Sequence, residues 1–134
     1  MTLDYTVCGQ VQIMMTYFLD EVLIDFDKAE PKGGGTKTRA APENIFNVDE
    51  DCDKLPQNKT VQFHNLAAKA LYATKRARSD TCTAVAFLTM RAREPDLDNW
   101  AKMVHMMRYI RGTRTLPLIL GANGSSILKW WVDA

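Results

Sequence analysis

The sequence lacks several features that would assign the chain to a specialised class of protein. No apolar run approaches the roughly 20 residues that a membrane-spanning helix needs. The N-terminal residues lack the basic and apolar regions of a secretory signal peptide. The three cysteines are odd in number and far apart, which argues against a disulfide framework and a zinc knuckle. These absences predict an intracellular protein, cytoplasmic or nuclear, with reduced thiols and no membrane partner.

The composition is that of one ordinary globular domain, but the charge is unevenly distributed. The 134 residues are 46% hydrophobic and 25% charged. Residues 1–60 carry 6 Lys/Arg against 11 Asp/Glu, a net charge of −5, whereas residues 61–134 carry 11 against 5, a net charge of +6. Such a division is typical of a polyanion-binding half, and it also arises when solvated helix faces merely differ in sign.

The first 27 residues predict a β-hairpin followed by a helix. Apolar residues alternate on both sides of Cys8-Gly9, which is the pattern of two strands joined by a turn that contains glycine. The period then changes to that of a helix, which Thr16 is expected to cap. The apolar face of this helix comprises Leu19, Val22, Leu23 and Phe26.

Residues 28–59 show no periodicity and predict a solvated, flexible linker. They contain three prolines, three consecutive glycines at 33–35 and an acidic run at 49–53. The glycines do not form a phosphate-binding loop, because the Lys-Ser/Thr pair that follows the glycines of such a loop is absent.

Residues 60–114 predict three short-linked helices that pack on one another as a bundle. Thr60, Asp80 and Asp96 are the expected N-caps, and Gly112 is the expected C-terminal stop. The apolar faces comprise Phe63, Leu66, Ala67, Ala70 and Leu71 in the first helix, Ala84, Val85, Leu88 and Ala92 in the second, and Trp100, Met103, Val104, Met107 and Ile110 in the third.

The last segment, residues 115–134, predicts a pair of strands. The apolar runs 116–120 and 127–132 are joined by turn-forming residues at 121–124. The order of elements is therefore hairpin, helix, linker, three-helix bundle and strand pair, which defines an α+β fold.

Three blocks of sequence carry a resemblance to a known family. The first, residues 3–26, has a hairpin with a glycine-containing turn, then Tyr17-Phe18 and a Leu-rich helix. The second is FHNLAAKALYATKRARSD at residues 63–80, followed by Thr83-Ala84-Val85. The third is NWAKMVHMMRYIRGTRTLPLIL at residues 99–120, with the RYIRGT motif at 108–113. In this order the blocks resemble the reverse transcriptases of copia-type retrotransposons.

The resemblance implies a fragment of a Pol polyprotein. Residues 1–27 would be the end of the palm and the first thumb helix, residues 60–114 the thumb and connection, and LKWWVDA the first strand of the RNase H domain. Polymerases of this family hold Mg²⁺ on a Tyr-x-Asp-Asp carboxylate pair that would precede this chain. Asp133 would be a first RNase H-like Mg²⁺ ligand in an incomplete site. Ser79 stands where the family usually has proline.

The resemblance also implies a partner, the RNA/DNA template–primer. The basic residues expected to contact its phosphates without sequence preference are Lys69, Lys75, Arg76, Arg78, Arg108 and Arg111. The basic residues that end the second block also complement a helix dipole, which is an alternative role. Asp20, Asp25 and Asp27 would give the first helix an acidic outer face that repels phosphate.

Two functions therefore follow from the sequence. The first is a fragment of a reverse transcriptase that contributes to template–primer binding during RNA-directed DNA synthesis and is inactive alone. The second is a non-catalytic nucleic-acid-binding or protein-interaction module that a host has retained. An enzymatic activity of the chain itself is not expected, because most carboxylates of both family active sites would lie outside it.

Overall fold

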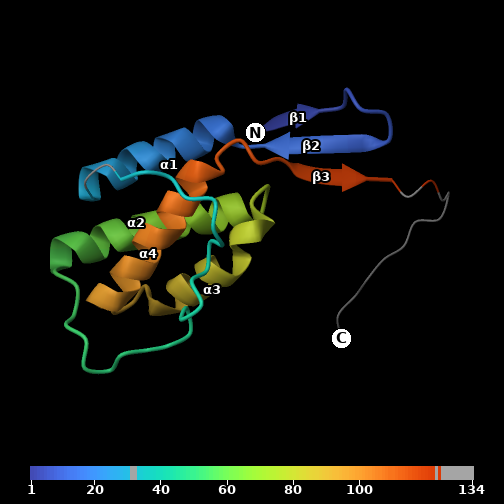
Figure 1. Ribbon diagram of the computed structural model, residues 1–134. Coiled ribbons are helices and arrows are strands. Elements are labelled where there is room, and N and C mark those ends of the chain that lie inside the picture. Colours follow the sequence, from blue (N-terminus) through green and yellow to red (C-terminus); the bar gives the residue numbers. More distant parts are fainter. Residues whose placement is uncertain (31–32, 123, 125–134) are drawn as a thin grey trace.

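The computed structural model describes residues 1–30, 33–122 and 124, and has the predicted α+β fold (Figure 1). Its helices are α1 (Thr16–Ala29), α2 (Gln57–Thr74), α3 (Cys82–Arg91) and α4 (Leu97–Gly112), with a short 3₁₀ turn, η1 (Ser79–Thr81). Its strands are β1 (Thr2–Asp4), β2 (Gln10–Met14) and β3 (Leu118–Gly121). The sheet projects from one end of a compact helical body.

The three strands form one antiparallel sheet in the order β1-β2-β3. The predicted hairpin joins β1 to β2, and Gly9 adopts a φ of 75° in its turn. The predicted partner of β3, residues 127–132, lies outside the described residues. Within the described chain β3 pairs with β2, so that Leu118 lies opposite Ile13. The first and last predicted segments therefore share a single sheet.

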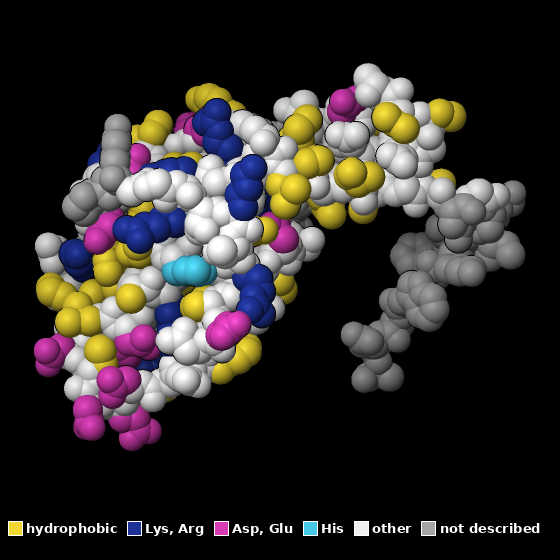
Figure 2. Space-filling view, viewed as in Figure 1, with side chains coloured by type: hydrophobic (Ala, Val, Ile, Leu, Met, Phe, Trp, Pro, Cys, Tyr) yellow, Lys and Arg dark blue, Asp and Glu magenta, His cyan; other side chains and the backbone are white. Residues whose placement is uncertain are grey.

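The two faces of the sheet differ in polarity. Side chains alternate between the faces along each strand, and paired residues lie on the same face. One face is apolar and comprises Leu3, Val11, Ile13, Leu118 and Leu120. The opposite face carries Asp4 and two glutamines, together with Thr2, Met14 and Ile119. Leu3 and Leu120 remain 43% and 51% exposed, and Figure 2 shows hydrophobic side chains along the projecting sheet.

The helical body contains four helices, one more than the predicted bundle. α1 contacts both α2 and α4, and α3 contacts α2 and α4, so that the four helices enclose one core. Nearly all of the predicted apolar residues are buried there, with Leu71 and Val104 only partly so. Phe63, Leu88 and Met103 have no measurable exposure. None of the described helices has both the length and the hydrophobicity to cross a membrane.

The described residues between α1 and α2, 33–56, form no helix or strand, as predicted, but they are not simply solvated. Ala40, Ile45 and Leu55 are buried in the same core as the helices. The backbone N–H of Leu55 donates to the carbonyl of Pro95 at 3.0 Å. The predicted solvation was wrong for these residues, which are too widely spaced to give a periodic signal although each is buried.

Two glycines allow this segment to approach the end of α4. A Cβ atom on Gly112 would lie 2.1 Å from the carbonyl oxygen of Thr36, and one on Gly35 would lie 2.7 Å from the backbone nitrogen of Gly112. Both distances are far inside van der Waals contact. Glycine is therefore needed at both positions for close backbone packing.

One of the predicted N-caps is confirmed and three are wrong. Asp96 accepts a hydrogen bond from the backbone N–H of Asn99 at 2.6 Å. Thr16 is instead the first residue of α1, and Thr60 lies inside α2, where its hydroxyl donates to main-chain carbonyls. Asp80 lies in η1 and binds side chains. α2 begins earlier than predicted because Pro56, with its fixed φ, directly precedes it.

We expect Phe63→Ala to lower the free energy of unfolding by about 3–5 kcal/mol, because it opens a cavity among the four helices. Val61→Ala on the same helix is the matched control. Val61 is 52% exposed, and its truncation should change the free energy by less than about 0.5 kcal/mol. Chemical denaturation of both variants provides the measurement, and equal effects would contradict this account of the core.

Candidate nucleic-acid interface

The aspartates of α1 bind cations from the C-terminal half of the chain. Asp25 accepts hydrogen bonds from Lys28, at 2.7 Å, and from Lys69 on α2. These bonds lower the pKa of the Asp25 carboxyl to about 2. Lys69 was predicted to contact phosphate, but its ammonium is bound by this carboxylate, which Lys28 also contacts.

Two further ion pairs connect α1 with the end of α4. The guanidinium of Arg111 binds Asp27 and the carbonyl of Gly33, and that of Arg114 binds Asp20 at 2.6 Å. The predicted acidic outer face of α1 is therefore neutralised by residues far along the chain. Arg111, another predicted phosphate contact, is only 19% exposed at its side chain.

Arg78 is buried and forms the centre of a polar network. Its side chain is 1% exposed and binds Asp80 through two hydrogen bonds, Nε to Oδ1 at 2.9 Å and Nη2 to Oδ2 at 2.7 Å. Nη2 also donates to the hydroxyl of Thr113 at 2.8 Å, and the Tyr109 hydroxyl donates to Asp80 at 2.7 Å. Burial places Arg78 out of reach of a phosphate in this conformation.

The network perturbs the titration of its acidic members. Burial alone would raise the pKa of Asp80, but hydrogen bonds from Arg78 and Tyr109 outweigh it and hold that pKa below its ordinary value. Burial and the bond to the Asp80 carboxylate both raise the pKa of Tyr109. The carboxylate is therefore charged and the phenol neutral at physiological pH, as a stable donor–acceptor arrangement requires.

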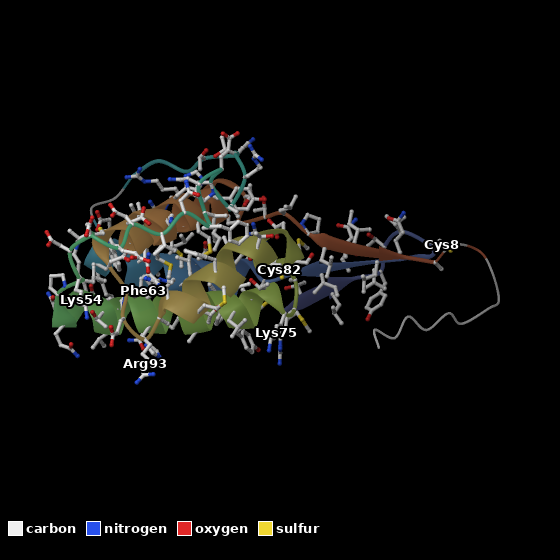
Figure 3. The ribbon with its side chains drawn as sticks, turned by 90° about the horizontal axis from the view of Figure 1, so that it is seen from below. Cys8, Lys54, Phe63, Lys75, Cys82 and Arg93 are labelled. Atoms are coloured by element: carbon white, nitrogen blue, oxygen red, sulfur yellow. The ribbon has the colours of Figure 1, made fainter. Side chains whose placement is uncertain are left out.

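The remaining three predicted residues, Lys75, Arg76 and Arg108, are exposed and make no ion pair within the described chain. They do not form one surface. Figure 3 shows that Lys75 points away from the side of the helical body on which residues 33–42 lie. Arg108 lies on that other side, against Gly33. The accessible predicted charges at the end of α2 are thus Lys75 and Arg76.

An aromatic side chain that the sequence reasoning did not select lies beside these charges. The guanidinium of Arg76 lies over the ring of Tyr72, 4.3 Å from its centroid. Phe18 of α1 contacts the same ring, with centroids 5.1 Å apart. The spacing of Tyr72 and Arg76, four residues apart on a helix, is the sequence signal that would have found the pair.

The predicted Mg²⁺ ligand Asp133 lies outside the described residues. Among residues 1–30, 33–122 and 124, no group of three or more His, Cys, Asp and Glu side chains is arranged to hold a metal ion. The geometry of the described part therefore offers charged and aromatic surfaces, without an assembled metal site.

No protein-family model, curated protein or solved structure matched this chain. The likeness to copia-type reverse transcriptases thus rests on the three sequence blocks alone and stays a prediction.

We expect Arg78→Met to lower the free energy of unfolding by roughly 3 kcal/mol, because the Asp80 carboxylate would lose its buried partner. The matched control is Arg114→Met. That ion pair is 50% and 40% exposed at its two side chains, so its loss should cost less than about 1 kcal/mol. Urea denaturation compares them, and a smaller effect at Arg78 would contradict its central role.

We expect the stability difference between the unaltered chain and Asp80→Asn to depend on pH. A carboxyl whose pKa is lowered in the folded state contributes stability above its unfolded value of 3.8, and the contribution is lost as pH falls through the folded value. Denaturation curves should therefore show the full difference at pH 6 and a shrinking one below pH 3.8. A difference that grows on acidification would contradict the assigned direction.

Proposed function

We propose that the chain belongs to the thumb and connection region of a copia-type reverse transcriptase and helps to hold the RNA/DNA template–primer. One observation carries the proposal. The two segments whose motifs resemble the family, residues 76–80 and 108–113, meet in a single network, in which Arg78 binds Thr113 and Tyr109 binds Asp80. The motif residues therefore maintain one geometry, which gives a physical reason for their joint occurrence.

The same network determines where nucleic acid would bind. Arg78 lies three residues beyond Lys75, the C-cap of α2, and its side chain is bound inside the fold. Lys75 and Arg76 are then presented at the exposed end of that helix without a carboxylate partner in the described chain. Cations of this kind bind phosphates of any sequence and release counterions, so that binding weakens with salt.

The role proposed for the described residues is binding rather than catalysis. RNA-directed DNA synthesis and RNA hydrolysis in this family require Mg²⁺ ions held by several converging carboxylates. In the parent enzyme those carboxylates would come from the polymerase motif and the RNase H domain. The Mg²⁺ chemistry of the parent enzyme is thus separate from the phosphate contacts proposed for Lys75 and Arg76.

The test is a salt titration of binding to a labelled RNA–DNA hybrid. We expect log Kd to rise linearly with log salt concentration, and Lys75→Gln to reduce the slope by about 1, because one phosphate contact is lost. Lys69→Gln is the matched control, since its ammonium is bound by Asp25, and it should change the slope less than Lys75→Gln does. A flat slope for the unaltered chain would remove the proposal.

A second function, that of a protein-interaction module, is favoured by the sheet. Its apolar face carries Leu3 and Leu120 at 43% and 51% exposure, and the strands contain no lysine or arginine. Such a face fits a partner polypeptide with an equally uncharged, apolar surface. A flat salt slope in the titration above would make this second function the better supported one.

A further inference from the structure

The end of α2 carries a layered arrangement of aromatic and cationic side chains. Phe18 contacts Tyr72 with an angle of 54° between the rings, and the Arg76 guanidinium covers the Tyr72 ring at 4.3 Å. Tyr72 is 45% exposed, and Arg76 is exposed as well. The contact with Phe18 packs the Tyr72 ring against α1, and the ring in turn supports the Arg76 guanidinium.

The environment of the Arg76 guanidinium differs from that of the arginines that are bound to carboxylates. Arg78, Arg111 and Arg114 bind carboxylates, which fixes the edges of their guanidinium groups. Arg76 makes no side-chain hydrogen bond in the described chain, and its guanidinium lies against the face of the Tyr72 ring. One face of a planar cation is thus covered by a ring, and the group is otherwise exposed to solvent.

A planar cation supported by an aromatic ring is suited to a specific ligand, an unpaired nucleobase. Bases that have left a duplex stack on aromatic rings and on arginine guanidinium planes, whereas paired bases have both faces covered by their neighbours. Lys75, which precedes Arg76 in the sequence, is exposed and can bind a phosphate of the same strand. Geometry and charge at this site therefore match a single-stranded segment better than a continuous duplex.

We propose that an unpaired base of the template stacks on the Tyr72–Arg76 pair, so that this surface prefers a template–primer junction with a single-stranded overhang to a fully paired hybrid. This inference rests on the proposed function, and it adds both a ligand class and a contact that is not directed at phosphate. Tyr72 acts by supporting the guanidinium, and Arg76 by contacting the base.

The test compares two labelled RNA–DNA hybrids of equal duplex length, one blunt and one with an overhang of unpaired nucleotides, by fluorescence anisotropy. Arg76→Lys keeps the charge and removes the plane. We expect it to weaken binding of the overhang hybrid about fivefold or more, the lower end of measured stacking contributions. Binding of the blunt hybrid should change by less than about twofold, because the phosphate contacts persist.

Two controls keep the outcome interpretable. Arg93→Lys alters another exposed arginine and should affect neither hybrid. Replacing the first unpaired base by an abasic site should reproduce the effect of Arg76→Lys, and the two changes together should be no worse than either alone. Thermal melts verify that both variants fold.

The failure of this inference is distinguishable from that of the proposed function. The unaltered chain could bind both hybrids in a salt-dependent way, while Arg76→Lys affects the two hybrids equally or not at all. That result would overturn the stacking site alone. Absence of binding to either hybrid would overturn both proposals. Preferential loss of overhang binding, matched by the abasic substrate, is the supporting result.

Discussion

The fold of the helical body depends on one buried cation, the guanidinium of Arg78. It lies just after α2 and binds Asp80 of η1 and Thr113 at the end of α4. Withdrawing such a charge from water is costly, and the cost is offset only where carboxylate and hydroxyl partners are in place. The Nη1 atom is buried without a partner in the described chain, so that the network is not fully satisfied. The network therefore specifies how three elements meet, and removing Arg78 alone is costly because its partners are left without that contact.

A second organising principle is the complementarity of the two halves of the sequence. The acidic N-terminal half places Asp20, Asp25 and Asp27 on α1, and the basic C-terminal half places cations opposite them. Much of the charge difference between the two halves is therefore neutralised by ion pairs within the molecule. The positive charge left for an external polyanion is smaller and more local than the net charge of either half indicates.

Local patterns in the sequence were sufficient to predict the helices, the hairpin and much of the core. The apolar faces of α1 and α4 follow helical periodicity, and the hairpin follows strand periodicity with a turn glycine, so that each is encoded within a few residues. Asp96 was predictable as a cap because its helix begins where the apolar pattern does. Thr60 and Asp80 were not, because Pro56 and the partners of Arg78 decide where those helices start.

Long-range contacts were beyond the reach of local patterns. The burial of Ile45, the pairing of β3 with β2 and the ion pair of Asp27 with Arg111 join residues with no common local signal. The prediction of the candidate interface failed in part for the same reason. Six basic residues share a charge and a region of sequence, yet three of them, Lys69, Arg78 and Arg111, are bound to carboxylates of the same chain.

The pairing of β2 with β3 has a consequence for how the chain folds. The two strands belong to opposite ends of the described chain, and the ion pair between Asp20 and Arg114 spans 94 residues. Closing so large a loop is entropically expensive and slow, and it follows the formation of local helices. On the ribosome, the central strand of the hairpin gains its second neighbour only after residues 118–121 have been synthesised. Until then its apolar side and open edge are available to other nascent polypeptides, a hazard that chaperones counter.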